Sequence, residues 1–131
     1  SWVGREARSS APAYFDGQPI EIFPQTIGAA DTKEIIVRDE SGAEVQRIPY
    51  ASGSESIQWD GVRADGAPMQ VGLYSFQIIG KANGDVTDQA GVDVYSKVNE
   101  VRIEAGQTML ILQGGAAIPS NQVTALRDAL A

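Results

Sequence analysis

Hydrophobic and polar positions alternate along much of this chain, and this pattern predicts β-strands. Residues 73–78 read LYSFQI, and a period of two places Tyr74, Phe76 and Ile78 on one face of a strand. Similar stretches recur between turn signals, so we expect about nine or ten short strands. The clearest are 20–23, 33–38, 44–48, 57–59, 73–78, 85–95 and 108–112, and a further strand is expected to begin at Trp2-Val3. This succession is typical of an all-β sandwich or small barrel.

Turn-forming residues separate these strands. Residues 39–42, DESG, lie between two predicted strands and indicate a hairpin. Asn83-Gly84 is the strongest short-range hairpin signal in the sequence, because both residues tolerate positive φ. Pro24 is expected to end its strand, since proline lacks the N–H that a sheet requires.

The C-terminal part of the chain has a different pattern of apolar residues. The apolar run 108–112 predicts a strand covered on both faces. Beyond it, we expect Ser120 to cap a short helix. Val123, Leu126 and Leu130 follow at spacings of three and four, which would place them on one face of that helix.

The loop that follows Trp59 is rich in turn residues. It contains Asp60-Gly61 and Asp65-Gly66, pairs that favour turns because glycine adopts positive φ freely and aspartate hydrogen-bonds to nearby main chain. Trp59 is the last large apolar residue before the loop, and its burial would contribute about 4–6 kcal/mol. We therefore expect a core tryptophan beside a turn in which Asp60 accepts main-chain N–H groups.

Two other interpretations of this loop are weaker. A Trp-Asp dipeptide is typical of propellers only when it recurs every 40–45 residues, and this chain contains it once. Asp60 and Asp65 are candidate calcium ligands, but Val62 and Ala64 occupy positions where an EF-hand needs oxygen atoms. The residue types therefore favour a structural role, and we expect no metal site.

Composition restricts the classes of partner. The 131 residues are 43% hydrophobic and 21% charged, which indicates a folded chain with room for one domain or two very small ones. Ten Lys and Arg against 17 Asp and Glu give a net charge of −7. Such a surface repels phosphate backbones and anionic lipid, so nucleic acid and membranes are not expected as partners.

Composition also restricts the chemistry. The chain contains neither cysteine nor histidine, which excludes disulfides, thiol catalysis and a Ser-His-Asp triad. Paired carboxylates, Asp39 with Glu40 and Asp85 with Asp88, are the remaining candidates for acid-base catalysis. Both pairs fall at predicted turns, where acids usually hydrogen-bond to the main chain. We therefore expect no enzyme, no cofactor and no small-molecule substrate.

Three aromatic residues near the N-terminus, Trp2, Tyr14 and Phe15, allow two interpretations. They could stack on sugars, which would make the chain a carbohydrate-binding module. Aromatic residues are more often buried than exposed, so we expect these three to fill the core of the barrel described below.

Several motifs resemble those of the bacterial flagellar hook-capping protein family. The similarity begins with Trp59-Asp60-Gly61 and Asp65-Gly66 and continues with Gly72 and Tyr74-Ser75-Phe76. Residues 36–45 resemble the strand, turn and strand that precede this motif in the family, and residues 2–6 resemble the start of its folded region. One departure is Gln70, where the family commonly has proline. The residues to which the resemblance assigns a structural role are Trp59, Asp60, Gly61, Asp65, Gly66, Gly72, Tyr74 and Phe76.

The resemblance implies a particular domain organisation. In this family, a fibronectin-III-like or immunoglobulin-like β-sandwich is inserted into a Tudor-like, or SH3-like, small barrel. Mapped onto this chain, residues 1–18 and 96–131 would form the barrel and residues 19–95 the sandwich. The change of composition near Ser96 is consistent with this division.

The resemblance also implies a function. The chain would be a non-enzymatic scaffold at the distal tip of the growing flagellar hook of a Gram-negative bacterium, where it promotes polymerisation of hook subunits. Its partners would be hook protein subunits and further copies of itself in an oligomeric cap. In this family, a mobile region that precedes the folded core serves export through the flagellar secretion apparatus. Because the sequence begins at Ser1, we expect it to be the folded core alone. The alternative is a carbohydrate-binding or adhesion module of an extracellular protein.

Overall fold

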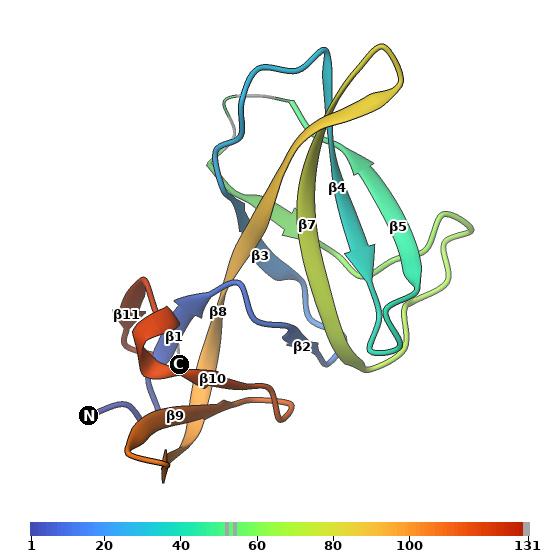
Figure 1. The fold of residues 1–131 in the computed structure, drawn as a ribbon. Coiled ribbons are helices and arrows are strands. Elements are labelled where there is room, and N and C mark those ends of the chain that lie inside the picture. Colours follow the sequence, from blue (N-terminus) through green and yellow to red (C-terminus); the bar gives the residue numbers. More distant parts are fainter. Residues whose placement is uncertain (52, 54, 130–131) are drawn as a thin grey trace.

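The computed structural model describes residues 1–51, 53 and 55–129. Within them the fold is all-β, as the alternation predicts (Figure 1). The strands are β1 (Glu6–Ser9), β2 (Ala13–Phe15), β3 (Ile20–Pro24), β4 (Thr32–Arg38), β5 (Glu44–Pro49), β6 (Ile57–Trp59), β7 (Gly72–Ala82), β8 (Asp85–Glu104), β9 (Gln107–Leu112), β10 (Ala117–Pro119) and β11 (Ala125–Arg127). A 3₁₀ turn, η1 (Ser120–Gln122), precedes β11.

Strand β8 organises the fold, because β7, β3, β1 and β9 all pair with it. It pairs with β7 up to Gly91, with β3 over residues 92–94, with β1 over residues 94–97 and with β9 from Val98 onward. The strand continues through residue 96, where the sequence suggested a change of domain. One strand therefore runs through both packed regions of the molecule (Figure 1).

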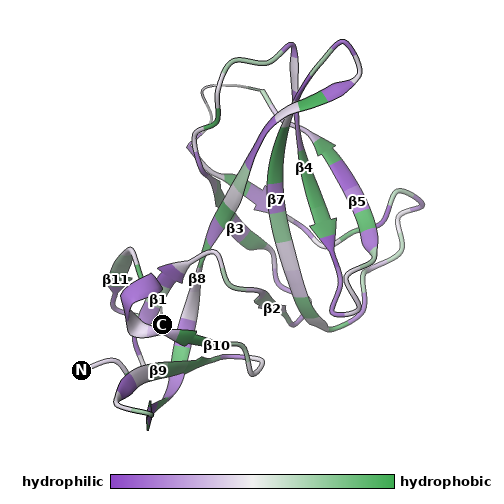
Figure 2. Ribbon diagram, viewed as in Figure 1, coloured by the Kyte–Doolittle hydropathy of each residue, from purple (hydrophilic) through white to green (hydrophobic). Residues whose placement is uncertain are grey.

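The first packed region, which we call the large lobe, consists of residues 13–94. Strands β4, β5 and β7 form one layer, and β3 and β6 lie across it (Figure 1). Apolar residues are concentrated along β4 and β7 (Figure 2), and those facing inward pack against Trp59 and Ile22. The buried members of this core are Ala13, Phe15, Ile22, Ile27, Ile35, Val37, Trp59, Met69, Tyr74, Phe76, Ile78, Val92 and Val94.

The second packed region, the small lobe, consists of residues 1–12 and 95–129. Its strands follow the order β11, β1, β8, β9, β10. The core of this lobe is small. Its buried residues in the described part of the chain are Ala7, Val98, Leu110, Leu112 and Ile118. Trp2, Val101 and Leu126 cover part of it.

Two predicted hairpins are confirmed. In the turn between β4 and β5, Oδ1 of Asp39 accepts hydrogen bonds from the N–H groups of Ser41, over 2.9 Å, and Ala43, over 3.2 Å. Between β7 and β8, Asn83 and Gly84 adopt φ angles of 54° and 82°. Two consecutive residues with positive φ are what a tight hairpin matched to the twist of its strands requires.

The predicted C-terminal helix is wrong. Ser120 begins a single 3₁₀ turn without a side-chain cap, and Leu126 belongs to β11, where it pairs with Ala7 of β1. A helix this short is marginal in water, whereas β11 satisfies its main-chain groups by pairing and buries part of Val123 and Leu126 against the small core. Leu130, the last residue of the predicted helical face, lies outside the described residues.

Three further expectations differ from the structure. Trp2 and Val3 form no strand, and the first strand begins at Glu6. The prediction that residues 108–112 are covered on both faces holds for one face only, since Leu110 and Leu112 are buried and the alternate residues are half-buried. Phe15 fills the core of the large lobe, not that of the barrel. Its strand β2 pairs with β7, which carries its ring beside Trp59.

The hairpin between β8 and β9 contains a strained residue, Ala105, with a φ of 50°. Left-handed backbone costs an L-residue about 1–2 kcal/mol, more than the entropy that a glycine would lose on folding. We expect Ala105→Gly to raise the free energy of unfolding by about 0.5–1 kcal/mol, measured by urea denaturation. Ala117→Gly, on a strand of ordinary backbone conformation, should lower it. An equal decrease in the free energy of unfolding of both variants would show that the backbone of Ala105 is not strained.

Candidate functional site

The residues singled out in the sequence meet at one end of the large lobe, around Trp59. Its side chain is 1% exposed, and its ring lies 5.2 Å from Phe15, 5.1 Å from Tyr74 and 5.2 Å from Phe76 between centroids. The indole Nε1–H donates to Oε1 of Gln46 on β5 over 2.8 Å. The sequence contains no signal for this partner, because a glutamine on a strand surface has no pattern of its own.

The two Asp-Gly pairs form consecutive turns after β6. Oδ1 of Asp60 accepts the N–H of Val62 over 3.1 Å, and Oδ1 of Asp65 accepts the N–H of Ala67 over 2.9 Å. Each aspartate thus hydrogen-bonds to the main chain two residues on, as aspartates in turns do.

The two glycines in these pairs have different surroundings. Gly61 has a φ of 68°, and a Cβ atom there would lie 2.3 Å from Cζ of Phe15. Gly66 has a φ of 88° with no atom within 4 Å of that position. Gly61 therefore serves both the turn and the packing of Phe15, whereas Gly66 serves the turn alone.

Gly72 and Tyr74 fix the start of β7. The N–H of Leu73 donates to Oε1 of Glu40 over 2.9 Å, and a Cβ atom on Gly72 would lie 2.7 Å from the same oxygen. The hydroxyl of Tyr74 donates to the main-chain carbonyl of Gln70 over 2.6 Å. The family commonly has proline at position 70, and here Gln70 provides the carbonyl that accepts this hydrogen bond. Burial raises the pKa of the Tyr74 hydroxyl. The eight motif residues therefore belong to a hydrophobic core and to the turns next to it.

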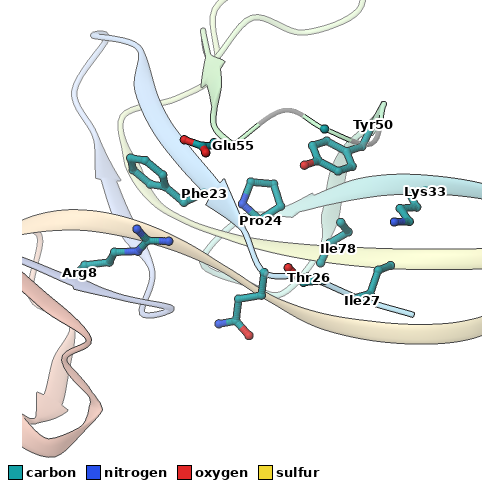
Figure 3. A pocket seen from close by; sticks show the side chains of 11 residues that line it. Arg8, Phe23, Pro24, Thr26, Ile27, Lys33, Tyr50, Glu55 and Ile78 are labelled. Carbon is teal, nitrogen blue, oxygen red and sulfur yellow. The ribbon is translucent and has the colours of Figure 1, made fainter. Parts of the chain in front are cut away.

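A groove of about 490 Å³ lies on the large lobe (Figure 3). It runs between β3, the chain after β3 and the start of β4, with Phe23, Pro24 and Ile78 along it. The guanidinium of Arg8 at one end is engaged by Asp93 over 3.1 Å. Its lining combines apolar side chains with the charged or polar side chains of Arg8, Lys33 and Glu55.

Three of the four carboxylates considered for catalysis, Asp39, Glu40 and Asp88, hydrogen-bond to the main chain. The hydroxyl of Ser41, followed by main-chain N–H groups, holds the pKa of Asp39 below its ordinary value. Asp88 accepts the N–H of Gly28 over 2.7 Å and of Gln89 over 2.8 Å, and these bonds lower its pKa. No group of three or more Asp, Glu, His or Cys residues that could hold a metal ion occurs among residues 1–51, 53 and 55–129.

The lowered pKa of Asp88 predicts acid sensitivity. A carboxyl whose pKa is lower in the folded state contributes stability above its unfolded pKa of about 3.9, and this contribution is lost as the pH falls through the lowered folded value. We expect the free energy of unfolding to decrease between about pH 5 and pH 3, and less steeply in Asp88→Asn. Urea denaturation across this range tests it. Asp85→Asn, an exposed control, should follow the native chain, and identical slopes for native chain and Asp88→Asn would refute the assignment.

The aromatic residues do not form an exposed platform. Each aromatic side chain in the described part of the chain is buried or half-buried. Trp2 packs against the small core and Phe15 is 2% exposed. Tyr14 is half-buried and belongs to neither core, contrary to the expectation that it fills the barrel. None of the described helical turns is long and apolar enough to cross a membrane.

Comparisons with known proteins assign the fold to a family. The family model described as the FlgD Ig-like domain matches residues 10–85. FlgD from P. aeruginosa superposes with a TM-score of 0.79 at 23% identity, covering 95% of this chain and 96% of that one. FlgD from Xanthomonas campestris, described in connection with the hook capping essential for flagellar assembly, superposes with a TM-score of 0.67 at 23% identity and covers 97% and 94%. No curated protein matches the sequence.

Proposed function

Because this chain belongs to the FlgD Ig-like domain family, we propose that it is a non-enzymatic scaffold that caps the growing flagellar hook and promotes polymerisation of hook subunits beneath it. The observation that carries the proposal is the family match over residues 10–85. It is supported by the similarity of fold to FlgD from P. aeruginosa over 95% of the chain. Fold similarity alone would leave the function open, since one fold serves many functions.

The proposed mechanism requires no cofactor. Hook protein subunits are the partners, and several copies of the chain form the cap at the distal tip of the hook in a Gram-negative bacterium, after export by the flagellar secretion apparatus. A cap that moves as each subunit enters needs contacts that break readily, because dissociation must keep pace with assembly. Side-chain contacts of modest area meet this requirement better than one large apolar interface.

The free edge of β5 is a poor candidate for these contacts. Tyr50 donates its N–H to the carbonyl of Lys33 on β4 over 2.9 Å. Main-chain groups alternate in direction along a strand, so those of the neighbouring Pro49 point toward the free edge. Proline has no N–H to donate there. A partner strand would therefore lack an N–H donor at the last residue of β5, and proline on an edge is one way in which sheets avoid unwanted pairing.

We also propose that the two lobes are two domains, an immunoglobulin-like or fibronectin-III-like sandwich inserted into a Tudor-like barrel. The separate hydrophobic cores support this division. Because Ala13 and Phe15 pack in the larger core, we place the first boundary before residue 13 instead of after residue 18. The second boundary lies within β8, close to residue 95.

The carbohydrate-binding alternative receives no specific support. Modules that bind sugars by stacking require an exposed aromatic face, and each aromatic side chain in residues 1–51, 53 and 55–129 is at least partly buried.

A count of hooks by electron microscopy tests the proposed function. The gene is deleted from the bacterium that encodes this chain, and the intact gene is restored as the control. We expect basal bodies without hooks in the deletion strain and normal hooks after restoration. Normal hooks in the deletion strain would show that the fold is present without the capping function.

A further inference from the structure

The two lobes are joined by more than strand β8. Arg8, on β1 of the small lobe, donates its Nε–H to Oδ2 of Asp93 over 3.1 Å. The Asp93 side chain is 9% exposed, and its Oδ1 also accepts a hydrogen bond from Nε2 of Gln25 over 3.0 Å. A buried carboxylate is costly when it loses a partner, so this pair holds β1 of the small lobe against the large lobe.

A row of stacked side chains crosses the same junction. The Arg8 guanidinium lies 4.5 Å from the centroid of the Phe23 ring on β3, and the two face each other in Figure 3. The rings of Phe23 and Tyr95 form a T-shaped pair with centroids 5.7 Å apart, and the Arg127 guanidinium of β11 lies 3.7 Å from the centroid of Tyr95. Cations over aromatic faces are attracted by the ring quadrupole, so the row links β11 of the small lobe to β3 of the large lobe.

A third contact comes from the turn between β9 and β10. Gly114, with a φ of 89°, approaches the large lobe so closely that a Cβ atom there would lie 2.8 Å from Cδ2 of Leu73 and 2.9 Å from Cβ of Tyr14. The next residue, Gly115, has a φ of 104° and no atom within 4 Å of that position. Gly114 therefore permits the main chain of the small lobe to rest on β2 and β7, and Gly115 makes no such contact.

These contacts restrict the angle between the lobes. Domains joined by a modest interface move relative to one another by default, and a single strand resists bending poorly. Here the shared strand is supplemented by the Arg8–Asp93 pair and by the contact of Gly114 with Leu73 and Tyr14. We propose that Arg8, Asp93 and Gly114 are positioning residues that hold the lobes at one angle, and that hook capping depends on this angle. The second part rests on the proposed function.

Spin-label distances test the first part. The chain contains no cysteine, so Val86→Cys and Ile103→Cys provide two unique labelling sites, at positions that are 54% and 69% exposed and lie toward opposite ends of β8. Double electron–electron resonance then reports the distance between the lobes. We expect one narrow distribution. A broad or bimodal one in the otherwise unchanged chain would overturn the proposal.

Two alanine variants of this labelled chain isolate the junction. Gly114→Ala and Gly115→Ala both place alanine at a positive φ, so their local strain is similar, but only the first inserts a carbon against Leu73. Contacting carbon atoms need about 3.5–4.0 Å, so the lobes must separate by about 1 Å. We expect a distance shift of at least that size, or broadening, in Gly114→Ala alone. Equal distributions in both variants would refute the role of Gly114.

A second variant keeps the test decisive if Gly114→Ala fails to fold. Arg8→Met keeps an unbranched side chain but removes the Nε–H donor and the cation, so the distribution should broaden. An unchanged distribution in Arg8→Met would overturn the role of the Arg8–Asp93 pair.

Hook counts test the dependence of capping on the angle. Full-length genes carrying Gly114→Ala or Gly115→Ala are returned to the deletion strain. We expect fewer hooks with Gly114→Ala and near-normal numbers with Gly115→Ala. Normal hooks despite a shifted distance would refute this dependence while leaving the proposed function intact, because that function is judged by the deletion strain itself.

Discussion

Replacing Trp59 with alanine is expected to lower the free energy of unfolding by about 3–5 kcal/mol, the loss typical of large aromatic residues removed from a core. The side chain is 1% exposed and contacts the rings of Phe15, Tyr74 and Phe76. These rings come from two strands, β2 and β7, so the cavity left by the indole cannot close by the movement of one element. Urea denaturation of the purified chain measures the effect.

A conservative variant separates packing from hydrogen bonding at this site. Trp59→Phe keeps an aromatic ring but removes the Nε1–H that donates to Gln46. The glutamine oxygen then loses its donor. We expect the free energy of unfolding to decrease by less than in Trp59→Ala, with about 1–3 kcal/mol of the decrease due to the lost hydrogen bond. A change below about 1 kcal/mol for Trp59→Ala would be inconsistent with the burial of this residue.

The second large effect is expected for Gly61→Ala. Two costs combine there. An L-residue at a φ of 68° is strained by about 1–2 kcal/mol. The new Cβ would also lie 2.3 Å from Cζ of Phe15, and forcing such a buried ring to move costs about 1–3 kcal/mol. We therefore expect a total loss of about 2–5 kcal/mol in urea denaturation.

The second Asp-Gly pair of the same loop provides the matched control. Gly66 has a φ of 88° and no atom within 4 Å of an added Cβ, so Gly66→Ala should cost the strain alone, about 1–2 kcal/mol. An equal decrease in the free energy of unfolding for the two glycine substitutions would mean that the contact with Phe15 does not contribute to the cost of Gly61→Ala. Gly61→Ala,Phe15→Leu provides a further check, since a smaller side chain at position 15 should make the two substitutions less than additive.

Local sequence determined much of this structure. A period of two along residues 73–78 identified the buried face of β7, because side chains of a strand must alternate between its faces. Asn83-Gly84 and residues 39–42 located two hairpins, since few residue types tolerate the backbone angles of such turns. Asp60 and Asp65 bond to main chain within two residues of themselves, so their role was encoded locally.

Where prediction failed, partners distant in the sequence decided the outcome. Leu126 pairs with Ala7 in a strand instead of joining a helix, because a short segment adopts whichever structure offers its main chain partners and its side chains a core. Phe15 lies beside Trp59 because β2 pairs with β7, a pairing that no local pattern specifies. Gln46 and Arg8 likewise gain their roles only through Trp59 and Asp93.

The sequence by itself therefore determined the all-β class and the positions of the turns, since each depends on residues within a few positions of one another. It also indicated the burial of Trp59, because a large apolar side chain is stabilised by leaving water. The tertiary structure alone decided that β8 continues through residue 96 and that Gly114 rests on Leu73 and Tyr14. These features depend on the relative placement of strands far apart in the chain. That placement is selected by the total burial and hydrogen bonding of the folded molecule, which local periodicity does not report.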